Sequence, residues 1–395
     1  MKVLHTSDWH IGRSIRGKSR NIEQASIIAE IAELCETNEI DLVLIAGDIF
    51  DHAAPSARAE DTAYKGLLSL AATGAQVVAI AGNHDNAIRW SALKPILKNS
   101  NIVVVSELAE EIDQNTIDIT TKSGEVAKVA CLPWISQRRL VRAADLMNVS
   151  RAEHQMNYRN GMQEILKRLA EPFTADTVNL MMAHLAMSEG TLDGSERKAE
   201  TVIDYCLDVD QLPSTAQYCA LGHYHKRQRL QGGAGEVWYS GSPTQLNFGE
   251  QSDIQGVNIF EVQAGQMLKQ DQIVQVSLNS GYQLRTISGN LPQLESLLQE
   301  KGPDLLSEGV FLRVNVEEPQ RTGLAQEVRE LFPNAVAVQT LSTMIEEPQI
   351  ARDLHGLDPH DLFSDYLKSK KVQDERLLSL FDQLYVEASN ETSAT

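Results

Sequence analysis

The sequence predicts an α/β protein in which helices cover the faces of β-sheet. Through the first half of the chain, short apolar and β-branched runs alternate with helical patterns. From about residue 275 the pattern changes to β-α-β-α-β. In addition, acidic, amide and imidazole side chains follow the ends of the main predicted strands. Functional groups in open α/β sheets gather at such strand ends, so the third observation also predicts where a site lies.

Short apolar runs bounded by turn residues predict the buried strands. These runs are KVLHTS (2–7), DLVLIAG (41–47), QVVAIAG (76–82), IVVVS (102–106), VAKVACLP (126–133), TVNLMMA (177–183) and QYCALG (217–222). Helical patterns cover residues 21–38, 59–73 and 151–171. EVWYSGSP (236–243) and GVNIFEV (256–262) look like further strands that pair after the last histidine motif.

Three domains are expected, with boundaries at 1–272, 273–345 and 346–395. The middle one is the β-α-β-α-β unit of about 70 residues, which is small but viable as a module. The last one holds two short amphipathic helices. Their apolar faces carry Leu362, Phe363, Tyr366 and Leu367 in the first and Leu377, Phe381, Leu384 and Tyr385 in the second. Such helices usually pack on their own domain, but these follow a Pro-containing link, so docking to a partner is a fair competitor.

Composition sets the class of protein. The chain has 395 residues, 42% of them hydrophobic and 23% charged, which is ordinary globular composition and argues against wholesale disorder. There is no run of 18 apolar residues and no signal-peptide pattern, so we expect no membrane association and a cytoplasmic location. The four cysteines are scattered without metal-type spacing and are predicted to be reduced core residues. They are Cys35, Cys131, Cys206 and Cys219.

The net charge of −19 argues against a general nucleic-acid binder, because neutralising phosphates requires clustered cations. Three local basic clusters nevertheless flank the motifs. They are residues 12–20 with four cations, then Arg138, Arg139 and Arg142, and finally Lys226, Arg227 and Arg229. Any one such cluster is usually a solvated loop, but together they modestly favour phosphate binding.

Seven side chains at predicted strand ends are candidate metal ligands. They are Asp8, His10, Asp48, Asn83, His184, His223 and His225. Each has a plain structural alternative: Asp8 could cap a helix, Asp48 could form a turn and His184 could be a satisfied core histidine. Chance rarely places a ligand type after every major strand, however. Glycines directly precede three of the positions, and we expect Gly47, Gly82 and Gly222 to let the backbone turn sharply there.

Seven donors are too many for one tetrahedral zinc and suit two metals that share a bridging carboxylate. Imidazole mixed with carboxylate and amide oxygen, without thiolate, favours Mn, Fe or Zn over Mg. We therefore expect two divalent ions, with Mn²⁺ ahead of Mg²⁺. Two ions about 3.5–4 Å apart activate a shared water and clamp the attacking and leaving oxygens of a phosphoryl displacement. The predicted reaction is phosphoester hydrolysis, and neither a P-loop nor a nucleophile elbow competes with it.

These motifs, in this order, resemble the signature of the calcineurin-like metallophosphoesterases. They are Asp-x-His (8–10), Gly-Asp-x-x-Asp (47–51), Gly-Asn-His-Asp (82–85), a lone His (184) and Gly-His-x-His (222–225). The flanking stretches HTSDWHIG, AGDIFD, CLPWISQRR, LGHYH and YSGSP resemble the SbcD family of DNA-repair nuclease subunits. The resemblance is tight to about residue 250 and looser beyond. It implies a four-layer αββα sandwich, a βαβαβ capping domain and a two-helix tail that clasps the coiled-coil base of an SbcC-type ATPase.

The resemblance also implies a role for each residue. Asp8, His10 and His225 would hold one metal, Asn83, His184 and His223 the other, and Asp48 would bridge them. His84 would bind no metal and would act as the general acid, with Asp51 orienting it. Archaeal and eukaryotic relatives usually have His at the position of Asp51, whereas here the next residue is His52, as in the bacterial branch. Asp85 is predicted to brace the turn.

The resemblance implies that the chain would be a homodimeric nuclease acting on DNA as a double-strand exonuclease and a single-strand or hairpin endonuclease. Two alternatives stay open. Another phosphodiesterase or phosphatase of the superfamily, acting on a small substrate, shares the motifs but rarely carries such a cap and tail. A non-catalytic scaffold for the ATPase would not need the complete ligand set or His84.

Overall fold

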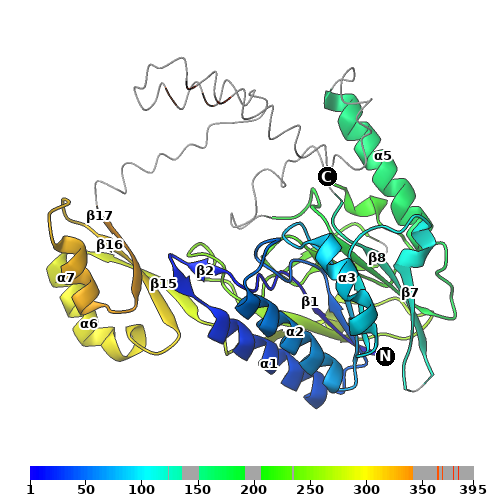
Figure 1. Ribbon diagram of the computed structural model, residues 1–395, viewed down its shortest axis with the longest axis horizontal. Helices are drawn as coiled ribbons and strands as arrows, with labels where there is room; N and C mark the ends of the chain where they lie inside the picture. The colour runs from blue at the N-terminus through cyan, green and yellow to red at the C-terminus, as the bar shows by residue number, and fades with distance from the viewer. Residues whose placement is uncertain are drawn as a thin grey trace. The chain divides into compact units, whose positions relative to one another are not determined.

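The structure is a computed structural model that describes residues 1–122, 124–135, 151–191, 206–233 and 235–340, together with residues 363, 367, 377 and 381. Its fold is mixed α/β, as the sequence predicts (Figure 1). The residues from Met1 to Leu341 form one compact unit, and those from Ser342 to Thr395 form a second.

Among the described residues, the first sheet has six strands in the order β14-β13-β1-β4-β5-β6. In chain order these are β1 (Lys2–Thr6), β4 (Leu42–Ile45), β5 (Gln76–Ile80), β6 (Ile102–Val105), β13 (Gly256–Glu261) and β14 (Val274–Ser277). β1, β4, β5 and β6 are parallel, whereas β13 runs antiparallel to both β1 and β14. The carboxyl ends of β1, β4 and β5 therefore meet at one edge of the sheet.

The second sheet also has six strands within the described ranges, in the order β11-β12-β10-β9-β8-β7. In chain order these are β7 (Thr116–Thr120), β8 (Val126–Leu132), β9 (Val178–His184), β10 (Tyr218–Gly222), β11 (Gln228–Leu230) and β12 (Glu236–Tyr239). The four central strands are parallel and the two edge strands are antiparallel to their neighbours. β12 and β13, the two strands expected after the last motif, join different sheets and do not pair with each other.

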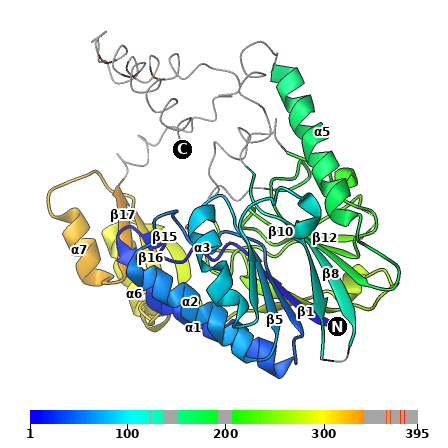
Figure 2. The ribbon, with the colours of Figure 1, turned by 45° about the vertical axis from the view of Figure 1, so that its right-hand side comes forward.

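The two six-stranded sheets lie beside each other with helices flanking them (Figures 1 and 2). The hydrophobic core lies between the two sheets and between each sheet and its helices. Leu42 and Leu44 of β4 face the second sheet, where they join the same cluster as Leu180 and Met182. The alternate positions of β4 face the helices instead, because successive strand side chains point to opposite faces. Burial on both faces explains why these strands read as continuous apolar runs.

Helices α1, α2 and α3 pack with the first sheet, and α5 packs with the second. Their bounds are α1 (Asn21–Thr37), α2 (Ala57–Ala72), α3 (Ala87–Lys98) and α5 (Arg151–Ala170). Helix α3 was not predicted from the sequence. It begins at a side-chain cap, where Asn86 Oδ1 accepts a hydrogen bond from the backbone N–H of Arg89 at 3.1 Å. Its periodicity is weak because Ile88 and Ile96 are exposed and Pro95 lies inside the helix.

The β-α-β-α-β order predicted from about residue 275 is confirmed. Its elements are β15 (Gln283–Gly289), α6 (Leu291–Leu305), β16 (Val310–Val316), α7 (Leu324–Leu331) and β17 (Ala335–Thr340). The three strands form a parallel sheet with a hydrophobic cluster of their own. β14 pairs with β13 of the first sheet, so the unit itself begins at Gln283 and not at residue 273.

Backbone-to-side-chain hydrogen bonds fasten the start of this unit to earlier parts of the chain. The N–H of Tyr282 donates to Glu23 Oε1 at 2.8 Å, and the N–H of Leu284 donates to Gln245 Oε1 at 2.7 Å. Arg20, buried beside Glu23, donates to the same acid at 2.6 and 2.5 Å. A buried charge is tolerated only when it is paired in this way.

Shorter elements complete the described chain. They are the antiparallel hairpin β2 (Ser14–Ile15) and β3 (Lys18–Ser19), and the 3₁₀ turns η1 (Ile112–Asn115), η3 (Val209–Gln211) and η4 (Gln270–Gln272).

Most of the predicted tail, 346–395, lies outside the described residues. The four positions that are described, Phe363, Leu367, Leu377 and Phe381, are helical. The rings of Phe363 and Phe381 stack with their centroids 4.3 Å apart. Phe363 of the first predicted helix therefore contacts Phe381 of the second.

The structure bears on the predictions for the cysteines and for membrane association. All four cysteines are buried, which confirms them as core residues. No helix in the described part of the chain is long and apolar enough to cross a membrane. The cytoplasmic location stays a prediction.

Candidate metal centre

The structure brings all seven predicted ligands together at the carboxyl ends of strands from both sheets. Asp8 and His10 follow β1, Asp48 follows β4, Asn83 follows β5, His184 ends β9, and His223 and His225 follow β10. Six of them are buried, and Asn83 is partly exposed. The register places Gly222 opposite His184, so the ends of β9 and β10 present their histidines side by side.

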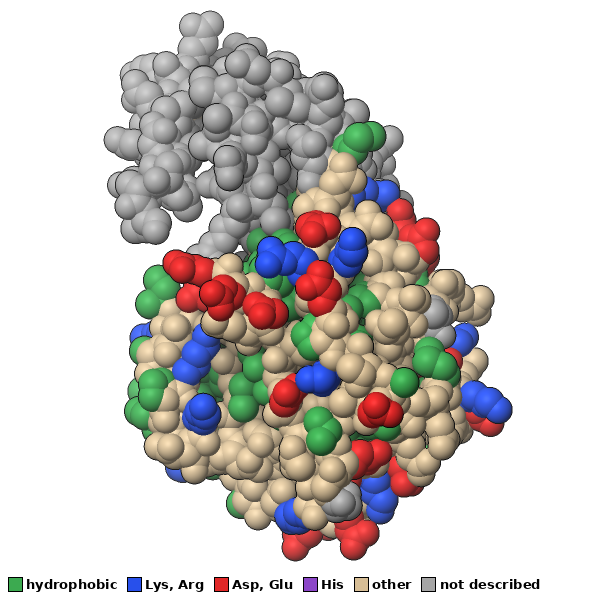
Figure 3. Space-filling view, turned by 90° about the vertical axis from the view of Figure 1, so that its right-hand side faces the viewer, with side chains coloured by type: hydrophobic (Ala, Val, Ile, Leu, Met, Phe, Trp, Pro, Cys, Tyr) green, Lys and Arg blue, Asp and Glu red, His purple; other side chains and the backbone are tan. Residues whose placement is uncertain are grey.

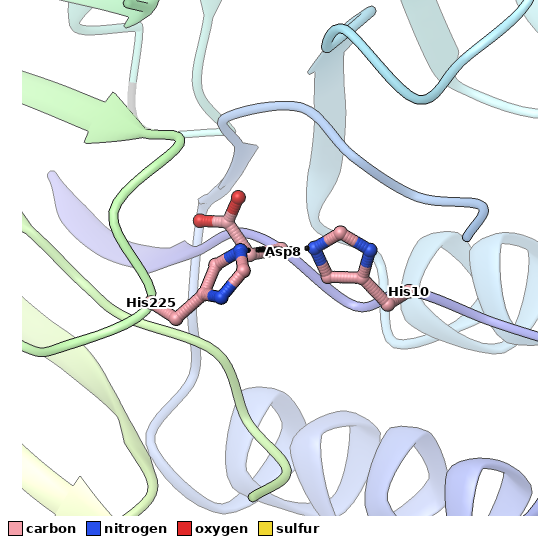
Figure 4. A group of neighbouring side chains, drawn as sticks. All are labelled: Asp8, His10 and His225. Atoms are coloured by element: carbon pink, nitrogen blue, oxygen red, sulfur yellow. Dashed lines mark hydrogen bonds between the residues drawn. The ribbon is translucent and has the colours of Figure 1, made fainter. Parts of the chain in front are cut away.

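Asp8, His10 and His225 form one group, whose ligand atoms all lie within 4.8 Å of one another (Figure 4). Nε2 of His10 lies 3.2 Å from Nε2 of His225. Two imidazole nitrogens at this distance need a proton or a cation between them.

Asn83 forms the centre of a second group. Its Oδ1 atom lies 2.8 Å from Nε2 of His184 and 3.1 Å from Nδ1 of His223. Nδ1 of His184 donates to the backbone carbonyl oxygen of Ala46 at 2.8 Å, which leaves Nε2 to face the site. A carbonyl oxygen can only accept, so this contact fixes the tautomer of the neutral His184 ring.

Asp48 lies between the two groups. Its Oδ2 atom is 3.5 Å from Nε2 of His184 and 3.8 Å from Nε2 of His10. Nε2 of His84 is 4.0 Å from the same oxygen. Asp48 is thus within reach of histidines from both groups.

The backbone around the site is strained. Asp8, His10, Asp48 and His223 all have φ between 46° and 108°, the left-handed region that L-residues seldom adopt. Such conformations cluster at functional sites, where the surrounding structure holds them in place. The sharp turns were predicted at the preceding glycines, but of these only Gly47 has a positive φ.

Gly82 and Gly222 have a different reason to be glycine. A Cβ on Gly82 would clash with the Asp48 carboxylate, and one on Gly222 would clash with the carbonyl of Ala46. Gly82 and Gly222 therefore allow strand ends to approach closely. The prediction that the backbone turns sharply at these two glycines is wrong.

The protonation of the cluster follows from burial and charge. Burial opposes ionisation of Asp48, but the charge and hydrogen bond of His184 lower its pKa well below the usual range. The same contacts overcome burial at His184 and raise its pKa to about 9. Burial raises the pKa of Asp8 to about 7 and lowers that of His223 to about 3. Burial also lowers the pKa of His225, followed by the charge of His10.

These residues fit a pair of divalent cations. Two buried carboxylates and four imidazoles converge at this site. Without metal ions to balance the carboxylates, the raised pKa values keep protons on His184 and partly on Asp8. His223 and His225 stay neutral, which is the form that binds metal. The donor set contains nitrogen and oxygen without sulfur, as predicted.

His84 is buried beside the cluster. Its Nδ1 atom lies 2.7 Å from the backbone carbonyl oxygen of Asp51, and its backbone N–H donates to Asp48 Oδ1 at 2.8 Å. Geometry alone also groups His84 with His10 and Asp48 as possible ligands. The distances between ligand atoms therefore do not test the prediction that His84 binds no metal.

Asp51 contacts His84 through its backbone carbonyl oxygen, while its carboxylate faces other residues. Its Oδ1 atom lies 3.3 Å from Nδ1 of His10 and 3.0 Å from Nη1 of Arg13, and both lower its pKa although burial opposes this. Its Oδ2 atom lies 3.1 Å from Nε2 of the exposed His52. The carboxylate thus orients a predicted ligand, His10.

Asp85 ties two loops together. It accepts hydrogen bonds from the backbone N–H groups of Ile49 at 3.2 Å, Phe50 at 3.0 Å and Gly82 at 2.9 Å. Burial and the charge of Asp48 raise its pKa to about 6 against these donors, so it is ionised at neutral pH. The prediction that Asp85 braces the turn is confirmed.

The basic clusters contribute less to a phosphate site than predicted. Arg20 is buried against Glu23, Arg229 pairs with Glu236, and Arg227 stacks on Trp238. The cations that remain exposed are Arg16 and Lys18 in the cluster of residues 12–20, and Lys226 in the cluster of residues 226–229. The cluster of Arg138, Arg139 and Arg142 lies outside the described residues. On the face that Figure 3 shows, acidic and basic side chains are interspersed and form no single-sign patch.

Two residues at the site escaped prediction. Ser7 Oγ donates to Asp8 Oδ2 at 2.6 Å and also lies 2.8 Å from Ser240 Oγ. The Trp134 ring stacks on His223. Both lie in stretches noted only as flanks, HTSDWHIG and CLPWISQRR, and a hydroxyl directly before a candidate ligand was the available signal for Ser7.

Two family models match the chain. The model for calcineurin-like phosphoesterases matches residues 1–227, and that for the type 5 capsule protein repressor C-terminal domain matches residues 281–371. The SbcD subunit of the SbcCD nuclease from Rhodobacter capsulatus is 30% identical to the chain, covering 67% of each. The chain belongs to the SbcD nucleases of the calcineurin-like phosphoesterase family.

Other SbcD relatives cover more of the chain at lower identity. The SbcD protein of Bacillus subtilis is 28% identical over 97% of both chains, and that of Escherichia coli K12 is 26% identical over 76% of this chain and 74% of its own. A solved structure of a dimetal phosphatase from Danio rerio covers 71% of this chain and 99% of its own, with a TM-score of 0.41 and 13% identity.

Proposed function

We propose that this chain is a metal-dependent DNA nuclease that works as an SbcD-type subunit beside an SbcC-type ATPase. The family assignment supports phosphodiester hydrolysis, and the names of the SbcCD relatives support DNA as substrate and an SbcC-type partner. The observation that carries the proposal is the place of Asp48, whose Oδ2 atom lies between His184 of one group and His10 of the other.

In this proposal Asp8, His10 and His225 hold one divalent ion, Asn83, His184 and His223 hold a second, and Asp48 bridges the two. Mn²⁺ is the proposed ion and is favoured over Mg²⁺, because the set mixes imidazole with carboxylate and amide oxygen. When bound, the ions supply an activated water and neutralise charge on the phosphate. Ser7 and Asp51 hold Asp8 and His10 in place through the contacts described above.

His84 is the proposed general acid. Because its Nδ1 atom faces a carbonyl oxygen, which can only accept, that nitrogen carries a proton in either charge state. The other nitrogen, Nε2, points toward the cluster, 4.0 Å from Asp48 Oδ2. A protonated His84 therefore presents a donor to the leaving oxygen, and the carbonyl contact fixes its direction.

The architecture proposed for this function is the four-layer αββα sandwich with a capping domain that begins at Gln283 and runs to residue 345, and an ATPase-binding tail of residues 346–395. The core clusters between the sheets and against the helices support the layers. The match of the second family model to residues 281–371 supports a separate C-terminal region. A homodimer is part of the proposal by family resemblance.

The test is a cleavage assay on linear duplex and hairpin DNA in Mn²⁺ and in Mg²⁺, with and without an SbcC-type ATPase. The proposal expects Mn²⁺-dependent cleavage, with the ATPase extending it to duplex ends. Hydrolysis of a small phosphodiester with no cleavage of any DNA would point to another phosphodiesterase of the family. Absence of both activities in a metal-loaded chain would favour the scaffold.

A further inference from the structure

Trp134 lies against one half of the metal centre. It follows the end of β8, and its backbone N–H donates to the carbonyl of Ala81 at 2.9 Å, two residues before Asn83. Its ring stacks on the His223 ring, with centroids 5.2 Å apart and planes at 28°. It also meets the His184 ring edge-on, at 6.1 Å and 79°. The indole thus contacts both histidines of the group centred on Asn83.

These two histidines are oriented in different ways. A ligand histidine is normally held by a hydrogen bond from its second ring nitrogen, which fixes the ring and its tautomer. His184 has this bond, from Nδ1 to the carbonyl of Ala46 at 2.8 Å. His223 has Nδ1 directed at Asn83, and its Nε2 atom is buried without a hydrogen-bond partner among the described residues.

The backbone of His223 does not by itself compensate for the missing bond. Its N–H donates to the Asp8 carboxylate at 3.0 and 3.2 Å, and its φ of 108° is strained. These features fix the main chain but leave rotation of the ring about the Cβ–Cγ bond unconstrained. The rings of His184 and Tyr224 lie near the His223 ring, with centroids 5.3 and 5.6 Å away, but the Trp134 indole is the one stacked on it and supplies the largest flat surface against that rotation.

We propose that Trp134 is a positioning residue that holds the His223 ring in its ligating orientation and so sets the affinity of one of the two metal subsites. The inference rests on the ligand set in the proposed function. The described ring contacts of Trp134 are to His184 and His223, whereas the rings of the other subsite, His10 and His225, contact each other with centroids 4.9 Å apart. The expected effect is therefore asymmetric between the two ions.

The experiment is a Mn²⁺ titration of the full metal-free chain, with bound and free ion counted by EPR. Trp134→Ala and Trp134→Leu remove the ring and are expected to weaken one of two sites by about 10–100-fold, the usual effect of losing an orienting partner. Trp134→Phe keeps a ring to stack and is expected to stay within a few-fold of the native affinity. The second site is expected to be unchanged in all three variants.

A further variant, His223→Ala, separates this inference from the ligand set. If His223→Ala still binds two ions at native affinity, the proposed ligand set is wrong. If it loses one ion while Trp134→Leu binds both as tightly as the native chain, the positioning role is overturned. Equal weakening of both sites in Trp134→Leu, with a lowered metal-free melting temperature, would also overturn it, since that marks a general structural role.

Discussion

Nδ1 of His84 lies 2.7 Å from the backbone carbonyl oxygen of Asp51, while the carboxylate of the same Asp51 lies 3.3 Å from Nδ1 of His10. One residue therefore orients two histidines by two different groups. Replacing the Asp51 side chain would leave the carbonyl contact to His84 in place and remove the contact to His10.

Substituting the Asp51 side chain therefore tests its contact with His10 separately from its backbone contact with His84. Asp51→Asn keeps the shape but removes the charge that faces His10 and Arg13. We expect weaker Mn²⁺ binding at the Asp8–His10–His225 group, by about 10-fold, with the His84 ring still in place. Two-site Mn²⁺ titration measures the first effect. Unchanged affinity at both sites would show that the carboxylate does not support His10.

Removing His84 tests the proposed acid. His84→Ala is expected to lower DNA cleavage by at least about 10²-fold, since the leaving oxygen loses its proton donor. Metal content after Mn²⁺ loading should stay at the native value, measured by elemental analysis. His84→Gln is the matched control, because it keeps a polar side chain that cannot donate a titrating proton. Loss of a metal ion in either variant would make His84 a ligand.

Asp85 has a structural role that stability measurements can test. Asp85→Ala leaves the backbone N–H groups of Ile49, Phe50 and Gly82 without their acceptor, and we expect a loss of roughly 2–4 kcal/mol in the free energy of unfolding. Urea denaturation of the metal-free chain measures it. The exposed Asp113 supplies the control, and Asp113→Ala should change stability by less than about 0.5 kcal/mol. A loss of similar size in both variants would contradict the bracing role.

The site could be located from the sequence because side-chain type and strand periodicity can both be read directly from the order of the residues. Gly-Asn-His-Asp after a buried strand places Asn83, His84 and Asp85 at a strand end, whatever the rest of the fold does. The strands themselves were predictable from continuous apolar runs such as LVLI, which signal burial on both faces.

What could not be predicted depends on contacts between distant segments. The assignment of β12 and β13 to different sheets depends on which neighbours they meet, and their sequences look alike as strands. The burial of Arg20 depends on its hydrogen bonds to Glu23 and to the backbone carbonyl of the distant Gln245, contacts that its charge alone did not indicate. The stack of Trp134 on His223 joins residues 89 positions apart.

Metal binding should release protons, because two ligands hold them in the metal-free chain. The pKa of His184 is raised to about 9 and that of Asp8 to about 7, so at pH 7 His184 is protonated and Asp8 is about half protonated. We expect release of about one to two protons per chain when Mn²⁺ binds at pH 7. Calorimetry in buffers of different ionisation enthalpy counts them. His184→Gln should lower the count by about one, and release of none from the native chain would contradict these protonation states.

The same histidine gives the metal-free chain a pH-dependent stability. A folded-state pKa raised from 6.5 to about 9 adds stability that is complete below pH 6.5 and is lost as the pH rises through about 9. Urea unfolding with chelator present, from pH 6.5 to 9.5, should show a fall that is smaller in His184→Gln. A native chain as stable at pH 9.5 as at pH 6.5 would argue against the His184–Asp48 pair.

The tail is expected to serve the partner and not the chemistry. Deleting residues 350–395 should abolish binding to an SbcC-type ATPase, measured by co-elution, because the stacked Phe363 and Phe381 are removed with the two apolar helical faces. Cleavage of DNA by the isolated chain in Mn²⁺ should persist, which also shows that the shortened chain is folded. Unchanged binding to the ATPase would make the tail a structural element of this chain alone.

The central claim is that Asp48 bridges two metal ions held by the strand ends of both sheets. Its most direct test is EPR of the full chain loaded with Mn²⁺, combined with metal counting. We predict two ions per chain whose spectrum shows exchange coupling through a shared carboxylate, and loss of that coupling in Asp48→Asn. One ion per chain, or two ions that give the six-line signal of isolated Mn²⁺, would contradict it.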